Sequence, residues 1–219
     1  IGTPLIDYVD APKKADFIVA ELSSFQLDTI DTFRPKIGVL LNITADHLDR
    51  YPNFDAYAAS KIRIFKNQQS GDIAVLNGSD PLVRFLTKPL KSTKLYYASL
   101  NIEDKGAVIN GTRIWFRFHE FKKRDHSEPI AKLASCDQSF LNVSKLKLKG
   151  RHNLENAAAA ALAALAAGAS PQTVQQALNR YRGAAHRLEH INTIHGVEFI
   201  NDSKATNVDA VIRAVESFS

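Results

Sequence analysis

The stretch that decides the fold is Phe17-Ile-Val-Ala-Glu-Leu-Ser-Ser-Phe-Gln-Leu27, in which an apolar run leads into a carboxylate and two hydroxyls. The apolar run predicts a buried strand that ends near Glu21. A second apolar run, Ile37-Gly-Val-Leu-Leu-Asn-Ile43, leads into Thr44-Ala-Asp-His-Leu-Asp49. Ligands of open α/β sheets bind beyond the carboxyl ends of the strands. We therefore expect two neighbouring strands to bring Glu21 and His47 to one edge of a sheet.

Apolar runs and helical periodicity alternate along the first hundred residues. The expected strands are Asp16 to Leu22, Ile37 to Ile43, Ile73 to Leu76 and Lys94 to Ala98. The expected helices are Ser23 to Thr32, Phe54 to Phe65 and one that starts at Asp80-Pro81. This alternation predicts an α/β fold with a doubly wound, mostly parallel sheet.

The pattern changes after Gly106, where short alternating runs predict antiparallel strands appended to the sheet. These runs are Val108-Ile109, Arg113 to Phe118, Phe140 to Val143 and Leu146 to Leu148. Between them, His119 to Ser135 is polar, has no clear period and predicts a surface excursion.

The last third of the chain predicts two helices, a hinge and the start of another unit. The helices are Asn153 to Ala167 and Pro171 to Tyr181, the second with Ser170 as its N-cap. Arg182 to Ala185 predicts a hinge, followed by a hairpin of Glu189 to Ile194 with Val197 to Ile200 and by a helix over Asp209 to Phe218. We expect one domain over residues 1–183 and the beginning of a second α/β domain over residues 184–219.

Composition narrows the class of protein. The 219 residues are 45% hydrophobic and 23% charged, which is typical of a soluble globular protein. The single cysteine excludes an intramolecular disulfide and favours a reducing compartment such as the cytoplasm. No apolar run reaches the roughly 18 residues that span a bilayer.

The formal net charge of +5 permits contact with nucleic acid or with anionic small molecules. The densest basic segment, Arg117 to His126, interleaves aromatic and cationic residues, as some surfaces that bind single strands do. A solvated hairpin edge explains this segment better. We therefore expect no contact with nucleic acid. We also expect no contact with a membrane and a monomeric protein.

Six motifs occur in one order along the chain: Glu21 to Leu27, Asn42 to Tyr51, Tyr57 to Lys61, Gly150 to Asn156, His186-Arg187 and Asn201 to Asn207. With these motifs the chain resembles the Mur ligase family over nearly its whole length, least in Lys88 to Lys145. The sequences of these motifs are most similar to those of family members that join D-glutamate to UDP-N-acetylmuramoyl-L-alanine in an ATP-dependent reaction.

The resemblance also implies which parts of the family's architecture are present. Family members have an N-terminal domain for the UDP group, a central ATPase domain and a C-terminal domain that brings the amino acid. The glycine-rich phosphate loop that opens the central domain has no counterpart in this sequence. The resemblance therefore implies an internal segment, part of the central domain plus the start of the C-terminal one, and such a segment is expected to be inactive alone.

The chemistry that the resemblance implies is ATP-driven amide formation. The substrate carboxylate takes the γ-phosphoryl group of ATP, and the amine of D-glutamate then attacks the acyl phosphate and releases phosphate. The barrier comes from bringing anions together, so magnesium ions and cationic side chains carry most of the catalysis.

The resemblance implies two Mg²⁺ ions and assigns their ligands to Glu21, His47 and Lys61. Glu21 is a hard oxygen donor, although a carboxylate favoured by a helix N-terminus explains it too. His47 would bind through its neutral imidazole, with a structural histidine as the alternative. Asp46 would orient that ring or simply form a turn.

Lys61 is the unusual ligand, because an ammonium group near two magnesium ions would be repelled. The family's solution is a carbamylated lysine, formed when carbon dioxide adds to the neutral amine. Burial favours the neutral amine, and Tyr57 shares a helical face with Lys61. Without the resemblance, a lysine whose stem packs while its ammonium reaches water would be the default interpretation.

The resemblance assigns the remaining site residues to the nucleotide and the substrates. Asn153 and Asn156 would face the adenine and phosphates, although Asn153 is also a candidate helix N-cap. Arg187 and Asp202 would close on the nucleotide or form an interdomain ion pair. The other assigned residues are Lys204 at the phosphoryl-transfer centre, Thr206 at the incoming amino acid, and Ser23 and Gln26 as weaker substrate contacts.

Two other functions remain open on the sequence. One is a different ligase of the same family, such as a folylpolyglutamate synthase, against which the Glu21 to Leu27 and Asn201 to Asn207 motifs speak. The other is a non-catalytic interaction module, because a fold does not fix a function. All the metal ligands that the resemblance assigns to this part of the family, Glu21, His47 and Lys61, are present. Their presence argues against a non-catalytic module.

Overall fold

A computed structural model describes residues 4–9, 15–46, 48–118, 133–146 and 150–218. Its main feature is a six-stranded sheet in which the strands follow one another in sequence order. The strands are β1 (Ile37–Leu40), β2 (Ile73–Asn77), β3 (Thr93–Tyr97), β4 (Gly106–Asn110), β5 (Arg113–Arg117) and β6 (Phe140–Asn142). The first four are mutually parallel and the last two pair antiparallel, which confirms the mostly parallel α/β sheet.

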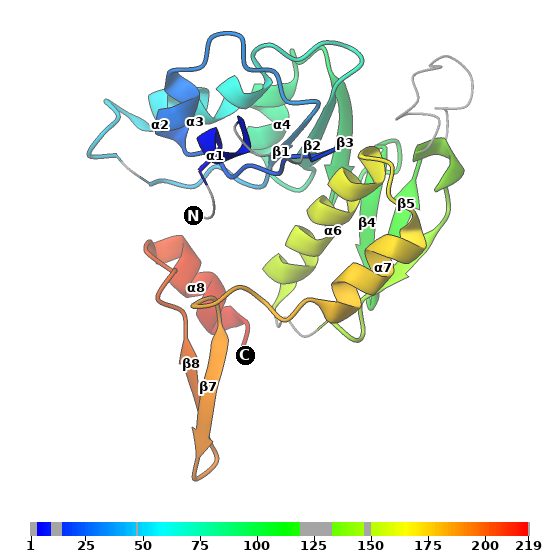
Figure 1. The fold of residues 1–219 in the computed structure, drawn as a ribbon. Coiled ribbons are helices and arrows are strands. Elements are labelled where there is room, and N and C mark those ends of the chain that lie inside the picture. Colours follow the sequence, from blue (N-terminus) through cyan, green and yellow to red (C-terminus); the bar gives the residue numbers. More distant parts are fainter. Residues whose placement is uncertain (1–3, 10–14, 47, 119–132, 147–149, 219) are drawn as a thin grey trace.

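Both faces of this sheet are covered, as a doubly wound fold requires (Figure 1). All five residues of β2 are buried. Ile73 and Val75 point into a core shared with α6, whereas Ala74 and Leu76 point into a second core shared with α3 and α4. The two alternating apolar sets explain why this strand reads as a continuous apolar run.

The helices that cover the sheet lie where the sequence predicts them. They are α3 (Phe54–Ile62) with its 3₁₀ extension η1 (Arg63–Phe65), α4 (Pro81–Thr87), α6 (Arg151–Ala166) and α7 (Pro171–Arg180). Asp80 caps α4 through Leu82 and Val83, and Ser170 caps α7 through Thr173, as expected. In the part of the chain that the structure describes, no helix combines the length and the apolarity that crossing a bilayer requires.

The expected strand from Asp16 to Leu22 is wrong. These residues form neither helix nor strand, and Phe17, Ile18 and Val19 are 63%, 54% and 98% exposed. A strand requires a neighbour for its backbone groups, and β1 pairs only with β2 in the described sheet. Glu21 therefore lies in an exposed segment without regular secondary structure and not at the end of a buried strand.

The expected helix after this segment is shorter than predicted. Helix α2 covers Ser24–Asp28, and a separate turn, α1, covers Ile6–Val9. Thr29 ends α2 as its C-cap, so residues 29–32 lie outside the helix.

The region after Gly106 is partly as expected. β5 and β6 are antiparallel additions, but β4 pairs in parallel with β3, so it belongs to the parallel part of the sheet. Residues 119–132 of the expected surface excursion, and residues 147–148 of the last expected strand, lie outside the described residues. Leu133, near the end of that excursion, is fully buried in the core with α6.

The outer edge of the sheet is covered at one point by a side chain. β6 is the last strand, and the Gln175 carboxamide of α7 bonds both backbone groups of Asn142. The amide nitrogen of Asn142 donates to Oε1 at 2.7 Å, and its carbonyl oxygen accepts from Nε2 at 2.8 Å. Gln175 thereby takes the hydrogen-bonding position of a further strand.

The last part of the chain forms a separate small unit. After α7, Gly183 adopts a φ of +95°, a left-handed conformation that suits glycine at the expected hinge. Strands β7 (Glu189–Ile194) and β8 (Val197–Asn201) form an antiparallel hairpin, followed by α8 (Val208–Glu216). The hairpin projects away from the six-stranded sheet, and α8 lies near the N-terminal end of α6 (Figure 1).

Candidate active site

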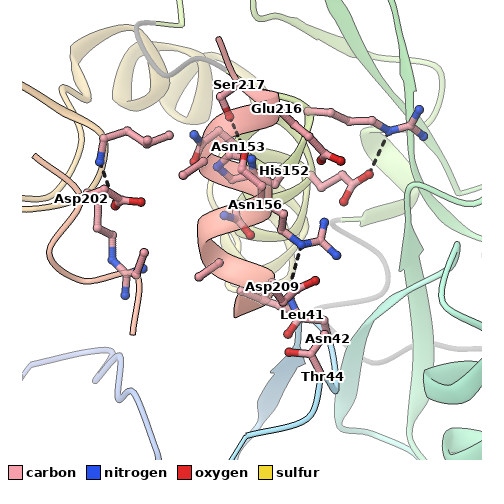
Figure 2. A pocket seen from close by; sticks show the side chains of 18 of the residues that line it. Leu41, Asn42, Thr44, His152, Asn153, Asn156, Asp202, Asp209, Glu216 and Ser217 are labelled. Carbon is pink, nitrogen blue, oxygen red and sulfur yellow. Dashed lines mark hydrogen bonds and ion pairs between the residues drawn. The ribbon is translucent and has the colours of Figure 1, made fainter. Parts of the chain in front are cut away.

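A cleft of about 700 Å³ lies between the six-stranded sheet and the C-terminal segment, which we define as residues 184–218. Its walls come from the loop after β1, the end of β2, the first turns of α6, the hinge and α8 (Figure 2). This position lies at the carboxyl ends of parallel strands, where α/β folds bind ligands.

All four residues that the sequence assigns to a nucleotide line this cleft. Asn153 and Asn156 come from α6, whereas Arg187 and Asp202 come from the C-terminal segment. The two asparagines are at least 31 positions from Arg187 and Asp202 in the sequence. They line the same cleft because the chain folds back after the hinge. Asp202 accepts a hydrogen bond from the Leu188 amide at 3.1 Å.

The first turn of α6 lines the cleft, and its N-cap is Gly150, which has no side chain that could bond the backbone amides of that turn. Asn153 is thus within the helix, and the alternative that it is the N-cap is wrong. Gly150 has a φ of +92°, and a Cβ there would lie 2.3 Å from the Ser217 hydroxyl oxygen. Only glycine allows this approach of α8 to α6.

Lys61 lies on α3, with its ammonium nitrogen 5.1 Å from the centre of the buried Tyr57 ring. Burial lowers the pKa of Lys61, and the Asp46 carboxylate nearby opposes this by raising it. The net direction favours the neutral amine. Burial and the same carboxylate raise the pKa of Tyr57.

Glu21, Ser23 and Gln26 lie on or next to α2, and all three are exposed. Ser23 is the N-cap of this helix and forms a complete capping box with Gln26. The Ser23 hydroxyl accepts from the Gln26 amide at 3.3 Å, and the Ser23 amide donates to Gln26 Oε1 at 2.9 Å. Both side chains therefore have a structural task, and their contact with substrate stays a prediction.

A set of side chains on α3 and η1 holds α2 in place. The Arg63 guanidinium donates to the carbonyl oxygens of Leu27, Asp28 and Ile30 at 2.8, 3.2 and 3.2 Å. The Ser60 hydroxyl donates to the Ser24 carbonyl at 2.8 Å. The segment that carries Glu21 is thus tied to Ser60, which precedes Lys61 on α3, and to Arg63, which begins η1 two positions after it.

The remaining predicted residues lie elsewhere. Lys204 and Thr206 are exposed and do not line the cleft, although the Lys204 amide donates to the His186 carbonyl at 3.1 Å. His47 lies outside the described residues. Within the described part of the chain, no three histidine, cysteine or acidic side chains form a group that could hold a metal ion.

Comparison with known proteins places the chain in a family. A family model described as the Mur ligase middle domain matches residues 1–164. The chain belongs to the Mur ligase family.

Proteins named UDP-N-acetylmuramoylalanine–D-glutamate ligase are similar to this Mur ligase chain along its whole length. The one from Desulfosudis oleivorans is 46% identical over 220 residues, which is 100% of this chain and 44% of that protein. The one from Pelotomaculum thermopropionicum is 44% identical over 218 residues, again 100% of this chain and 45% of that protein. The chain thus spans less than half the length of the curated relatives that it matches.

Solved Mur ligase structures share the fold. MurF from Acinetobacter baumannii aligns with a TM-score of 0.60 at 21% identity, covering 84% of this chain and 37% of that one. MurF from Thermotoga maritima, solved with ADP, aligns with a TM-score of 0.54 at 17% identity, covering 84% and 39%. At these identities the likeness concerns the fold alone.

The cleft of this Mur ligase chain also contains residues that the sequence did not single out. Tyr97 donates its hydroxyl proton to the Leu41 carbonyl at 2.6 Å, and burial raises the pKa of Tyr97 strongly. Arg213 of α8 bonds Asp209 at 2.9 Å and faces His152 and Glu155 of α6. His152 stands within the Gly150 to Asn156 motif, which was a signal for it, but nothing local in the sequence marks Arg213 or Tyr97.

Proposed function

We propose that the complete protein is an ATP-dependent ligase that adds D-glutamate to UDP-N-acetylmuramoyl-L-alanine in peptidoglycan precursor synthesis. The relatives that carry this name match the chain from end to end. The observation that carries the proposal is the cleft in which Asn153 and Asn156 face Arg187 and Asp202. We assign residues 1–183 to the central ATP-binding domain and residues 184–219 to the start of the amino-acid-binding domain.

The cleft fits a nucleotide in size and chemistry. Its volume of about 700 Å³ lies within the range of small-molecule sites. Carboxamides such as those of Asn153 and Asn156 both donate and accept hydrogen bonds, as the edge of a purine requires. Arg187 offers a planar set of donors to phosphate oxygens. The first turn of α6, whose N-cap glycine makes no side-chain hydrogen bond, adds backbone N–H groups to this donor set.

The cation ligands we propose are Glu21, His47 and Lys61, with Lys61 in its carbamylated form. An unmodified ammonium group repels Mg²⁺, but the half-buried Lys61 has a lowered pKa and hence more of the neutral amine that reacts with carbon dioxide. The resulting carbamate supplies hard oxygen donors, which Mg²⁺ prefers. Bound Mg²⁺ would neutralise the charge between the triphosphate and the substrate carboxylate.

The residues of the chain have separate tasks in the reaction. Arg187 and the α6 amides hold the phosphates, so that the substrate carboxylate meets the γ-phosphoryl group. Lys204 neutralises charge on the transferring group, and Thr206, Ser23 and Gln26 orient the substrates. The carboxylate gains the phosphoryl group as ADP leaves, and the D-glutamate amine then replaces phosphate at the acyl carbon. Preorganised cations lower the barrier because both reactants are negatively charged.

Phosphate release by the complete protein tests this function. We expect release with ATP, UDP-N-acetylmuramoyl-L-alanine and D-glutamate, and little with L-glutamate or other amino acids. Turnover with a folate and glutamate would identify the folylpolyglutamate synthase alternative instead, and absence of turnover with every substrate would favour an interaction module. Amide formation by the isolated 219 residues would show that our domain assignment is wrong.

Lys61→Ala tests the cation site directly. In the complete protein we expect ligation to fall by at least about 100-fold, because the loss removes a preorganised charge at the reaction centre. Added formate or acetate should restore part of the activity by replacing the missing oxygen donor. Lys66→Ala, an exposed lysine just beyond η1, is the matched control and should leave the rate unchanged. Full activity of Lys61→Ala would contradict the proposal that a carbamylated Lys61 is a Mg²⁺ ligand.

A further inference from the structure

Asn207 connects the two parts of the molecule through a single carboxamide. It is the N-cap of α8, where its Oδ1 accepts from the Ala210 amide at 2.9 Å. Its Nδ2 donates to Oδ2 of Asp46 at 3.1 Å, across a separation of 161 residues. Asp46 lies in the loop that follows β1. One side chain therefore starts α8 and joins it to the edge of the six-stranded sheet.

The chemistry of this position requires an amide. An N-cap needs an acceptor, which serine, threonine or aspartate supplies equally well. The bond to the Asp46 carboxylate needs a donor at the same time. Asparagine supplies acceptor and donor from two separate atoms of one planar group, whereas in serine or threonine a single hydroxyl oxygen would have to serve both partners. The bond is charge-assisted, and both side chains are half-buried.

The partner of Asn207 stands at the candidate cation site. Asp46 precedes His47 in the sequence, and its carboxylate lies near enough to Lys61 and Tyr57 to act on both. Nothing in α8 is buried, so apolar packing does not fix where this helix lies. At its two ends α8 approaches the sheet unit through Asn207, which bonds Asp46, and Ser217, which lies against Gly150, and between them Arg213 faces His152 and Glu155 of α6.

We propose that Asn207 is a positioning residue of the ligase reaction, which holds the C-terminal segment over the cleft by bonding Asp46 beside the cation site. This inference rests on the proposed function. The bond exists only when the segment lies against the sheet unit, so it links closure of the cleft to the arrangement around Lys61. Asp46 gains a fixed orientation at the same moment that the cleft closes.

Asn207→Asp in the complete protein is the informative variant. Aspartate keeps the N-cap of α8 but sets a second carboxylate against Asp46. We expect kcat/KM for D-glutamate to fall about tenfold, a typical coupling between two sites. Asn207→Ser, which caps without reaching Asp46, should show a smaller loss. Asn192→Asp in β7 makes the same chemical change on the same segment and should leave kcat/KM unaltered.

Exchanging the two side chains, so that Asp46 becomes asparagine and Asn207 becomes aspartate, distinguishes loss of this bond from a general loss of stability. Asp46→Asn combined with Asn207→Asp restores a donor and an acceptor in reversed positions. We expect the double variant to be more active than the product of the two single effects predicts. Independent effects of the two substitutions would overturn the proposal.

A distance measurement tests the bond without relying on catalysis. Spin labels at Lys66 and Val197, with Cys136→Ser to remove the only thiol of these 219 residues, report the separation of the sheet unit and the hairpin. With a non-hydrolysable ATP analogue, Asn207→Asp should shift the population to longer distances, and the double variant should reverse the shift. An unchanged distance distribution would overturn the inference. If the wild type releases no phosphate with any substrate, the proposed function fails, and the distances still decide the role of Asn207.

Discussion

The six-stranded sheet and the C-terminal segment are held together in opposite ways. The strands and helices of the sheet unit enclose side chains such as Val75, Leu95 and Leu162, which have no exposed surface. In the C-terminal segment, no described residue is buried. Its hairpin is maintained by backbone pairing, and α8 by its cap and an Arg213–Asp209 pair. Apolar packing thus fixes the first unit, whereas polar contacts fix where the second lies.

This contrast bears on function because the cleft lies between the two units. Asn153 and Asn156 stand on the rigid side, and Arg187 and Asp202 stand on the side held by a few hydrogen bonds. Segments with few buried apolar contacts are the ones that open at low free-energy cost. If the cleft binds a nucleotide, as proposed, we expect the C-terminal segment to move toward the sheet unit on binding, while Asn153 and Asn156 stay in place.

The largest expected effect on stability comes from a cavity in the sheet unit. Leu162→Ala on α6 should lower the free energy of unfolding by about 3 kcal/mol, because the side chain is fully buried. Val215→Ala on α8, where the side chain is 65% exposed, should change it by less than about 0.5 kcal/mol. Urea unfolding followed by fluorescence of the single Trp115, in β5, measures both. A large effect of Val215→Ala on the free energy of unfolding would contradict the view that apolar packing contributes little to the position of α8.

A medium effect should appear where α2 is tied to the sheet unit. Arg63→Ala removes three hydrogen bonds to carbonyl oxygens, two in the last turn of α2 and one just after it, and should lower the free energy of unfolding by about 2 kcal/mol. In the complete protein the same variant should raise the Mg²⁺ concentration needed for half-maximal rate, since Glu21 loses its fixed place. Lys66→Ala is again the control. Unchanged Mg²⁺ dependence would show that the candidate site does not rely on this connection.

The smallest effect concerns pH at the contact between α6 and α8. Burial lowers the pKa of His152, and Arg213 lowers it further, against the opposing charges of Glu155, Asp202 and Glu216. A base whose folded pKa lies below its unfolded value destabilises the fold as pH falls through the unfolded value of about 6.5. Stability should therefore decrease between about pH 7 and pH 6. In His152→Gln the loss of stability that His152 causes should be absent. Midpoints of urea unfolding at several pH values measure it. If the variant and the wild type show the same pH dependence, His152 is not the group responsible.

Much of the fold follows from local sequence signals. Repeated apolar residues locate α3 and α6, and Asp80-Pro81 and Ser170-Pro171 mark helix starts because proline and a capping side chain act within one turn. The hairpin and the hinge follow from glycine and from alternation in the same way. These features depend on neighbours along the chain, which a single sequence contains.

The errors share a different cause, because they depend on partners distant in sequence. The run Phe17 to Ala20 is as apolar as β2, yet no described strand pairs with it. Apolarity predicts a tendency to be buried, but strand formation also needs a neighbouring backbone. Similarly, the α6 face of the cleft was predictable from a motif, whereas Arg213 and Tyr97 reach the cleft through tertiary packing alone.

The carboxamide of Gln175 has a consequence for how the molecule behaves in a crowded solution. A terminal strand with free amide and carbonyl groups is a template on which foreign chains add, and such growth leads to aggregates. At Asn142 both groups are already satisfied from within the molecule. An incoming strand would have to displace two short bonds before gaining any of its own, so this side of the sheet discourages self-association without using a charge or a proline.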